Sequence, residues 1–453
     1  MNMNFKTADV DMLHGPLAKK LLLFTIPIAL SSILQQLFNA ADTVVVGYFG
    51  NKDALAAVGT NTEIIALIVA VSSGLSVGVN ILVANLIGKN RKNEVADAVR
   101  TAVMLSVFIG VPGAALGQLA AEPLLRLIQT PDGILRDAVL YLRIYMLGYP
   151  FLLLYDFGSA VLRARGNSRY PFFVLAFSGA ANVGLNLFFV IVFRMGVAGV
   201  AIATGISNMV SALTVLHRLS KENQLHSAPH KPRLFLKYTA KVLKTGVPSA
   251  VQGAVFCFAN IFVQASANSF GETAIAGSVV AMNFEYFTYY LITAFGQTAT
   301  TFTGQNYAAG QKKRCGKILW LCLLLSAVCS SVPIFTIVLF RAFFSGLFTP
   351  DRAVIESAAV RILCILLFEP LCSLYEIPSG VLRGSGHALY PAVSTVIGTC
   401  AFRIIWIYTV FRANPTLSVL YYAFPLSWVF TVLFVNSGFL MTCYAEKVKT
   451  KSS

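Results

Sequence analysis

About twelve apolar stretches, each long enough to cross a lipid bilayer as a helix, follow one another along this 453-residue chain. One crossing needs about 20 mostly apolar residues. Apolar residues make up 57% of the sequence and charged residues 12%, whereas about a quarter of an ordinary soluble domain is charged. The predicted spans lie approximately at residues 17–47, 53–84, 95–121, 134–161, 168–193, 196–217, 240–269, 273–305, 316–345, 354–381, 389–411 and 416–443. The sequence therefore predicts an all-α, polytopic membrane protein embedded in the lipid bilayer.

The net charge of +16 is spread unevenly between the loops at the two ends of these spans. One set of alternate loops holds clusters of Lys and Arg, whereas the other set holds isolated charges such as Lys52, Arg194 and Arg412. Because cytoplasmic loops carry the excess of Lys and Arg, we expect both termini and the long central loop to be cytoplasmic. The basic charge is thus a signal of membrane topology, and no nucleic-acid partner is expected.

The two halves of the chain repeat each other at a nearly constant spacing of half the chain length. Residues 161–171 (VLRARGNSRYP) match residues 381–391 (VLRGSGHALYP), and Pro27 matches Pro248. Matches that keep one spacing across a whole half are hard to obtain by chance, so we infer an internal repeat. It predicts a six-helix lobe at residues 1–217, a connector at 218–239 and a second six-helix lobe at 240–453.

An even number of spans per repeat gives both halves the same orientation in the membrane. Two such lobes, related by an axis along the membrane normal, are typical of transporters that work by alternating access. The sequence has no GxxxxGK[ST] phosphate-binding loop, so we expect an ion gradient, and not ATP hydrolysis by this chain, to supply the energy. We expect a transporter and no enzymatic activity.

Several motifs, taken in order, resemble the multidrug and toxic compound extrusion (MATE) family of secondary transporters. Pro27 is followed by QQLFNAAD at residues 35–42, and LRxxGxxxxP occurs in both halves. The resemblance implies export of cationic or amphipathic organic compounds in exchange for Na⁺ or H⁺, with no other cofactor. It also implies a monomer in the bacterial cytoplasmic membrane. The span at 240–269 has no acidic residue, which favours the bacterial DinF-like branch.

One carboxylate and three neutral polar side chains are candidates for the coupling-ion site. Asp42 lies in an otherwise apolar span, where a carboxylate costs about 2.5–3.5 kcal/mol on insertion scales. Asn182 and Asn186 are four residues apart and share one helix face, and the loop charges place them and Thr204 at a similar depth. Their oxygens suit Na⁺, and protonation of Asp42 is the alternative. The resemblance implies an N-terminal cation site at these positions, whereas a contact between helices is the competing interpretation.

Acidic residues repeated in the second and eighth spans are candidates for the substrate cavity. Glu63 and Glu285 match each other in the repeat, and Asn283 and Tyr289 lie close to Glu285 in the sequence. A carboxylate beside aromatic rings suits an organic cation through charge and cation–π contact. The competing interpretation is that these acids are satisfied by Arg403 or by backbone groups.

Four further charged residues are candidates for gate or structural ion pairs. Glu369 precedes Pro370 and competes for Arg403, which predicts a structural Glu369–Arg403 pair. Asp156 and Glu376 match each other in the repeat, and each lies seven residues before an arginine. We expect them near the cytoplasmic helix ends, either in ion pairs at a gate or in ordinary helix-end contacts.

Two other functions remain open at the level of the sequence. A lipid-linked saccharide flippase of the same superfamily would be expected to have arginines in its cavity and two further helices, and the sequence indicates neither. A channel or receptor is disfavoured because neither a pore-loop filter nor a soluble sensor domain is visible. An ion-coupled exporter is the function that the sequence favours.

Overall fold

The computed structural model describes residues 9–49, 52–221 and 232–451, and every regular element within them is a helix. The first half contains α1 (Leu17–Phe49), α2 (Lys52–Gly88), α3 (Lys92–Leu127), α4 (Asp132–Leu147), α5 (Tyr149–Ala164), α6 (Arg169–Leu187), the π-helix η2 (Phe188–Val192) and α7 (Gly196–Lys221). The second half begins with α8 (Pro232–Asn268), α9 (Glu272–Ala308), α10 (Lys312–Leu339), α11 (Arg341–Gly346), α12 (Arg352–Cys364), the 3₁₀-helix η3 (Leu366–Cys372) and α13 (Ser373–Gly384). It ends with α14 (Leu389–Thr395), the π-helix η4 (Val396–Ala401), α15 (Phe402–Trp406), the π-helix η5 (Ile407–Phe411) and α16 (Leu417–Lys451).

These helices make up twelve membrane spans, as predicted. Ten helical segments among the described residues are long and apolar enough to cross a bilayer, and α4 and α5 form an eleventh span with a bend of 44°. Pro150 in the first turn of α5 cannot donate the backbone hydrogen bond that would continue α4. The twelfth span is α9, whose 37 residues are long enough but include many Thr, Gly, Gln and Asn residues.

The central connector is shorter than predicted. The sequence assigned residues 218–239 to it, but α7 continues to Lys221 and α8 begins at Pro232. Proline suits the first turn of a helix, and the Lys, Arg and Leu residues that follow favour helix in water as well as in the membrane. A hydrogen bond from the Tyr238 hydroxyl to Glu94, at 2.9 Å, attaches this extension to α3. Residues 222–231 lie outside the described part of the chain.

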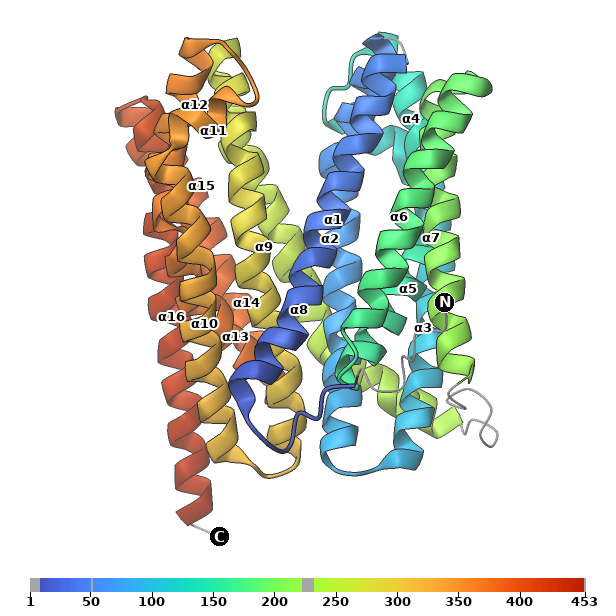
Figure 1. The fold of residues 1–453 in the computed structure, drawn as a ribbon, viewed down its shortest axis with the longest axis vertical. Helices are drawn as coiled ribbons and strands as arrows, with labels where there is room; N and C mark the ends of the chain where they lie inside the picture. Colours follow the sequence, from blue (N-terminus) through green and yellow to red (C-terminus); the bar gives the residue numbers. More distant parts are fainter. Residues whose placement is uncertain (1–8, 50–51, 222–231, 452–453) are drawn as a thin grey trace. The chain divides into compact units, whose positions relative to one another are not determined.

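The described chain forms two compact units that differ from the contiguous halves predicted from the repeat (Figure 1). Among the described residues, the first unit comprises those up to Asp11 and those from Ile26 to Ala250, and the second comprises Met12–Thr25 and those from Val251 onward. The first part of α1 therefore belongs with the second unit, and the first part of α8 belongs with the first. Both changes of unit occur within three residues of a proline inside a helix, Pro27 in α1 and Pro248 in α8.

Glycine makes the close packing of α8 in the first unit possible. A Cβ atom added to Gly74 of α2 would lie 2.4 Å from the Ala250 backbone, and one added to Gly78 would lie 2.2 Å from the Val242 carbonyl oxygen. Only a residue without a side chain allows two helix backbones to approach this closely in a membrane. One apolar core of this unit is built mainly from α2, α3, α5 and α7 together with the start of α8.

Large apolar side chains cover the outside of both units. Phe177 is 72% exposed in the first unit, and Trp320 is 72% exposed in the second. Exposed apolar surface on this scale is unusual for a soluble protein. It is expected where the solvent is lipid, because hydrocarbon solvates these side chains.

Candidate functional site

Four polar side chains from three helices of the first unit meet near the end of α1. Asp42 lies seven residues before the end of α1, Asn182 and Asn186 lie one turn apart on α6, and Thr204 lies on α7. Asp42, Asn182 and Asn186 are buried, with exposed fractions of 8%, 5% and 0%. Thr204 is half-buried. The structure thus brings together the four residues that the sequence singled out as the coupling-ion site; we call them the Asp42 cluster.

Hydrogen bonds connect the members of the Asp42 cluster. Asn186 Nδ2 donates to Asp42 Oδ1, and Thr204 Oγ1 lies 3.4 Å from Asp42 Oδ2. The same hydroxyl lies 3.0 Å from the Val200 carbonyl oxygen of its own helix, so its single proton can serve only one acceptor at a time. The carboxylate is therefore held by neutral donors, and none of the ion pairs found among the described residues includes Asp42.

The amide of Asn182 has two orientations that differ in what they offer Asp42. In one, Nδ2 lies 3.4 Å from Thr204 Oγ1 and Oδ1 accepts from Asn186 Nδ2 at 3.3 Å. In the other, Nδ2 donates to Asp42 Oδ1 at 2.9 Å and Oδ1 accepts from the Thr204 backbone at 3.2 Å. The second orientation satisfies the amide better and gives the carboxylate another donor.

The donor atoms of the Asp42 cluster fit a small hard cation. Asn186 Oδ1 is buried and has no hydrogen-bond partner among the described residues. A half-turn of the Asn186 amide would exchange Nδ2 for Oδ1 beside Asp42, and Asn182 can do the same. The cluster would then offer a carboxylate, two amide oxygens and a hydroxyl, all of them oxygen ligands of the kind that Na⁺ and other hard cations take.

The proposed substrate carboxylate of the second unit is engaged in an ion pair. Arg361 of α12 binds Glu285 of α9 through two bonds of 2.7 and 2.8 Å and donates to Ser278 at 2.6 Å. Arg361 is only 4% exposed and the Glu285 side chain 12%. From the sequence we expect Arg403 as the competing partner of Glu285, and the partner found in the structure, Arg361, was not identified there. An arginine inside a predicted span is itself the signal that could have identified it, because such residues are expensive in a membrane and are usually paired.

The other predicted substrate residues are not gathered around Glu285. Asn283 is exposed and its amide donates to the Val279 carbonyl oxygen of its own helix at 2.8 Å. Tyr289 stacks on Phe256 with ring centroids 6.4 Å apart. Glu63 lies on α2 in the first unit, where its side chain is exposed.

The predicted Glu369–Arg403 ion pair does not form. Glu369 of η3 instead accepts a hydrogen bond from the Thr288 hydroxyl of α9. Arg403 donates to Asn260 Oδ1 at 2.9 Å and to Ser427 Oγ at 3.1 Å. The reason is the irregular backbone: Glu369 lies in a 3₁₀ segment and Arg403 lies between two π segments, so ideal helix periodicity misplaces both side chains.

Asp156 and Glu376, which match each other in the repeat, have different partners. Glu376 pairs with Arg383 on its own helix at 3.4 Å, and Arg383 also donates to Gln252 at 3.1 Å. Asp156 accepts a hydrogen bond of 2.6 Å from Ser72 of α2. Each contact lies within one unit, so these acids hold helices together inside a lobe; their proposed role at a gate stays a prediction.

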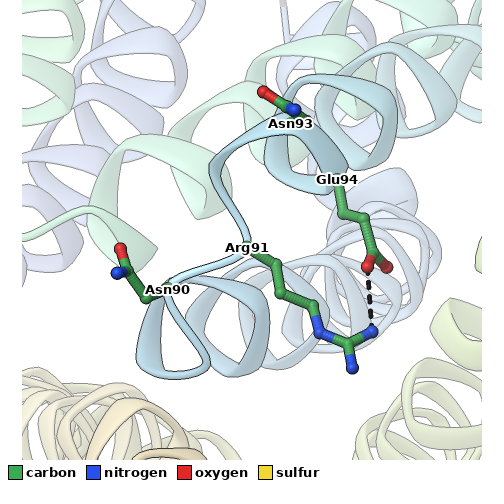
Figure 2. Close-up of a pocket in the computed structure, with 4 residues that line it drawn as sticks. All are labelled: Asn90, Arg91, Asn93 and Glu94. Carbon is green, nitrogen blue, oxygen red and sulfur yellow. Dashed lines mark hydrogen bonds and ion pairs between the residues drawn. The ribbon is translucent and has the colours of Figure 1, made fainter.

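A polar pocket lies away from all of these residues, at the turn between α2 and α3. It is lined by Asn90, Arg91, Asn93 and Glu94, and Arg91 pairs with Glu94 at 2.8 Å (Figure 2). Its lining comes from one short stretch of sequence and contains no apolar side chain that could hold an amphipathic compound. We assign no transport role to it.

The family model described as MatE matches the chain twice, at residues 27–188 and 248–409. The two matches begin at Pro27 and Pro248, the prolines that the predicted repeat pairs with each other. Probable multidrug resistance protein YpnP of Bacillus subtilis is 28% identical over 394 residues, which cover 87% of this chain and 88% of that protein. Probable multidrug resistance protein NorM of Thermotoga maritima is 28% identical over 403 residues, covering 85% and 84%.

A solved structure of a MOP superfamily transporter from Pyrococcus furiosus has the same fold. Its TM-score is 0.89 at 21% identity, and the match covers 97% of this chain and 99% of that one. The paired family matches, the full-length relatives and the twelve helical spans agree with one another. The chain therefore belongs to the MATE family of membrane transporters.

Proposed function

We propose that this protein is an antiporter that exports amphipathic organic compounds, organic cations among them, in exchange for Na⁺ or H⁺, with the Asp42 cluster as the coupling site. The observation that carries the proposal is a buried carboxylate held only by neutral donors. An acidic residue within an apolar span marks an ion pathway or a proton relay more often than a structural contact. Asp156 and Glu369 each accept a hydrogen bond from one hydroxyl, whereas Asp42 is surrounded by two amides and a hydroxyl that can present further oxygens to a cation.

The Asp42 cluster offers two ways to remove the charge of the carboxylate. Na⁺ would bind Asp42 together with the oxygens of Asn182, Asn186 and Thr204 after the amides turn. A proton would instead bind the carboxylate and leave the amides where they are. Either event lowers the cost of keeping Asp42 away from water, and it therefore favours a state in which the cluster is closed.

The structure of α1 supports a way to transmit this change. Pro27 removes one backbone hydrogen bond inside the helix, which weakens it at that point. Close to this proline, between Thr25 and Ile26, α1 also passes from one compact unit to the other. A change at Asp42 would therefore bend the part of α1 beyond Pro27 against α6 and α7, and in doing so would reduce the space available to substrate in this lobe.

Glu63 is the acid that we propose for contact with the cationic group of a substrate. Glu285 is neutralised by Arg361, whereas Glu63 is exposed on α2 of the lobe that contains the Asp42 cluster. A carboxylate that is not neutralised internally can attract an organic cation, and the same lobe would then hold both the substrate charge and the coupling ion. Competition between the two is the simplest physical basis for exchange.

We propose that both termini are cytoplasmic, which puts the Asp42 cluster in the outer half of the membrane. Cysteine labelling tests this orientation with two exposed positions, Lys221→Cys at the end of α7 and Arg412→Cys at the end of η5. An impermeant maleimide added to intact cells should label Arg412→Cys and spare Lys221→Cys. The reverse result would invert the topology and place the cluster on the inner side.

Separate ion gradients in proteoliposomes test the coupling. Purified protein is reconstituted with an ethidium-like dye, and a Na⁺ gradient or a pH gradient is imposed alone in the direction that drives export. One of the two should accelerate dye movement, and an ionophore that collapses that gradient should abolish the acceleration. Dye movement that responds to neither gradient would contradict the proposed antiport.

A further inference from the structure

Two equivalent hydrogen bonds, one within each lobe, give a residue-by-residue alignment of the two repeats. In the first unit, Ser211 Oγ of α7 donates to Ser178 Oγ of α6 at 2.6 Å. In the second unit, Thr399 and Thr431 make the same contact between η4 and α16 at 2.8 Å. At the spacing of the repeat, Thr399 takes the place of Ser178 and Thr431 takes the place of Ser211. A shared contact between equivalent helices gives a local register that does not depend on overall sequence similarity.

This register matches Arg403 with Asn182 and Phe424 with Thr204. Arg403 follows Thr399 by four residues, as Asn182 follows Ser178, and Phe424 precedes Thr431 by seven residues, as Thr204 precedes Ser211. The equivalent side chains also touch: Asn182 Nδ2 lies 3.4 Å from Thr204 Oγ1, and the Arg403 guanidinium lies 4.0 Å from the centre of the Phe424 ring. The two lobes therefore have a side-chain contact at the same pair of positions. In the first lobe it joins two neutral polar groups, and in the second it joins a guanidinium and an aromatic ring.

One additional residue in the second repeat accounts for this match. Six residues separate Pro171 from Ser178, whereas seven separate Pro391 from Thr399. The π-helix η4 (Val396–Ala401) lies where the additional residue enters, and π segments of this kind often occur at functional sites. Without the additional residue, Phe402, and not Arg403, would match the position of Asn182.

The guanidinium of Arg403 is the cationic group at this position. The side chain is fully buried, and none of the ion pairs among the described residues involves it. Asn260 and Ser427 accept hydrogen bonds from Nη1 and Nε, and Nη2 has no hydrogen-bond partner within the described chain. The rings of Phe424 and Phe256 cover the guanidinium at 4.0 and 5.5 Å. An amide, a hydroxyl and two aromatic rings are groups that stabilise a cation without neutralising it.

The carboxylate of the first lobe has no equivalent in the second. Pro27 of α1 pairs with Pro248 of α8 in the repeat, and Val263 follows Pro248 at the same interval at which Asp42 follows Pro27. Val263 is 2% exposed. Without a carboxylate at this position, a mobile cation would have only neutral ligands, which bind it more weakly. A covalently attached guanidinium does not dissociate, and arginine stays charged at any physiological pH.

We propose that Arg403 is a tethered cation: its guanidinium occupies, in the C-terminal lobe, the position at which the N-terminal lobe takes up and releases its coupling ion. The C-terminal lobe then holds a permanent positive charge at this position. Of the two equivalent positions, only the Asp42 cluster responds to the ion gradient. This inference rests on the proposed function, because it assigns the exchangeable ion to the Asp42 cluster. It identifies Arg403 as a positioning residue for the C-terminal helices.

Chemical rescue with free guanidinium tests the tethered cation. Arg403→Ala removes the side chain and leaves a cavity bordered by Asn260, Ser427, Phe256 and Phe424. We expect dye export per folded molecule to fall by about tenfold, a typical size for coupling between a charged site and a conformational change. Millimolar guanidinium chloride should restore most of it, with a saturable dependence that the wild type lacks. Urea has nearly the same shape but no charge, and it should restore nothing.

Two measurements separate this role from simple packing. Export is measured well below the thermal midpoint of each variant, so that every molecule is folded and a change in stability alone leaves turnover unaltered. Rescue by urea as effective as that by guanidinium would overturn the proposal, as would a guanidinium effect on the thermal midpoint without any effect on turnover. The rescue does not depend on which ion Asp42 binds, so failure of the coupling-ion proposal would appear separately, in the gradient assay.

A second pair of variants covers the case in which Arg403→Ala does not fold. Arg403→Lys keeps the charge, whereas Arg403→Gln keeps a planar polar group and removes the charge. We expect Arg403→Lys to retain most of the export and Arg403→Gln to lose about as much as Arg403→Ala. Equal turnover of Arg403→Gln and the wild type would overturn the proposal, because the charge would then have no function.

Discussion

The two lobes use the same helix framework around buried polar groups, yet the Asp42 cluster of the first holds a carboxylate without a cation, whereas the second holds two buried arginines. In the first unit, Asp42 is held by amides and a hydroxyl. In the second, Arg361 neutralises Glu285 and Arg403 stands among Asn260, Ser427 and aromatic rings. We propose that this difference leaves one site of the duplicated fold free for exchange, while the equivalent position holds a permanent charge.

The physical reason lies in the cost of a buried charge. A buried ion pair is satisfied at all times, so it stabilises one arrangement of helices and responds to no gradient. A buried carboxylate without a cation is satisfied only when an ion or a proton arrives, so the stability of its surroundings depends on ion concentration. The predictions that follow test whether charge in the C-terminal lobe is structural and charge in the N-terminal lobe is exchangeable.

The largest expected effect is on the stability of the C-terminal lobe. Arg361→Met removes the cation and leaves Glu285 buried and unpaired, which should cost about 3–5 kcal/mol. Titration of purified protein with SDS in mixed micelles measures the free energy of unfolding. Adding Glu285→Gln to Arg361→Met should recover much of the loss, because no charge is then left unpaired. Equal stability of Arg361→Met and the wild type would contradict a structural role for the Arg361–Glu285 ion pair.

The next effect is on coupling in the N-terminal lobe. Asp42→Asn keeps the size of the side chain and removes its charge, so gradient-driven export should fall by about a hundredfold. Its free energy of unfolding should stay within about 1 kcal/mol of the wild type, because an amide can still bond Asn186 and Thr204. Dye efflux and SDS titration of the same preparation measure both. Asp132→Asn is the control, since that carboxylate is 96% exposed at the start of α4. Undiminished efflux in Asp42→Asn would contradict the coupling site.

A smaller effect is expected at the hydroxyl of the Asp42 cluster. Thr204→Val keeps the shape of the side chain and removes one oxygen, so the apparent affinity for the coupling ion should fall by about fivefold, as the loss of one hydrogen bond or ligand implies. Thr204→Ser keeps the oxygen and should stay near the wild type. The ion concentration that gives half-maximal export measures the change. If both variants behave alike, Thr204 is not a ligand.

The smallest effects should be equal in the two lobes. Ser211→Ala removes the hydrogen bond to Ser178, and Thr431→Val removes the one to Thr399. Hydrogen bonds between membrane helices average about 0.6 kcal/mol, so each change should lower the free energy of unfolding by about that amount. SDS titration of both variants checks the shared register directly. A loss in one lobe without a matching loss in the other would weaken the alignment that places Arg403 opposite Asn182.

Much of the fold follows from local patterns in the sequence. Runs of apolar residues determine spans because a backbone in lipid must satisfy its hydrogen bonds within a helix. The helix ends were harder to predict, as at α7 and α8, because helices extend beyond the bilayer wherever propensity allows. Asn182 and Asn186 could be assigned to one face because their spacing of four residues lies in a regular helix. Asp42 and Thr204 were assigned to the same site because the predicted topology places them at a similar depth in the membrane.

One of the two errors about ion pairs falls where the backbone departs from regular helix. Arg403 was assigned to Glu369, and Arg361 was overlooked as the partner of Glu285. Arg403 lies between two π segments and Glu369 lies in a 3₁₀ segment, where the direction of a side chain cannot be calculated from the regular period of an α-helix. Arg361 lies in the regular helix α12, and its pairing with Glu285 depends on the packing of α12 against α9. The equivalence of Arg403 and Asn182 depends on one additional residue, and only the contact between Thr399 and Thr431 reveals where it enters.

The sequence by itself determined the twelve spans, the duplication and the residues of the Asp42 cluster, because these follow from hydrophobicity, spacing and the cost of charge in a membrane. The tertiary structure alone decided which buried charges are paired. Pairing depends on where long side chains from different helices end, and a guanidinium can reach several partners from one position on its helix. For this reason the contrast between the carboxylate of Asp42, which has neutral partners, and the buried guanidiniums of Arg361 and Arg403 emerged only from the folded chain.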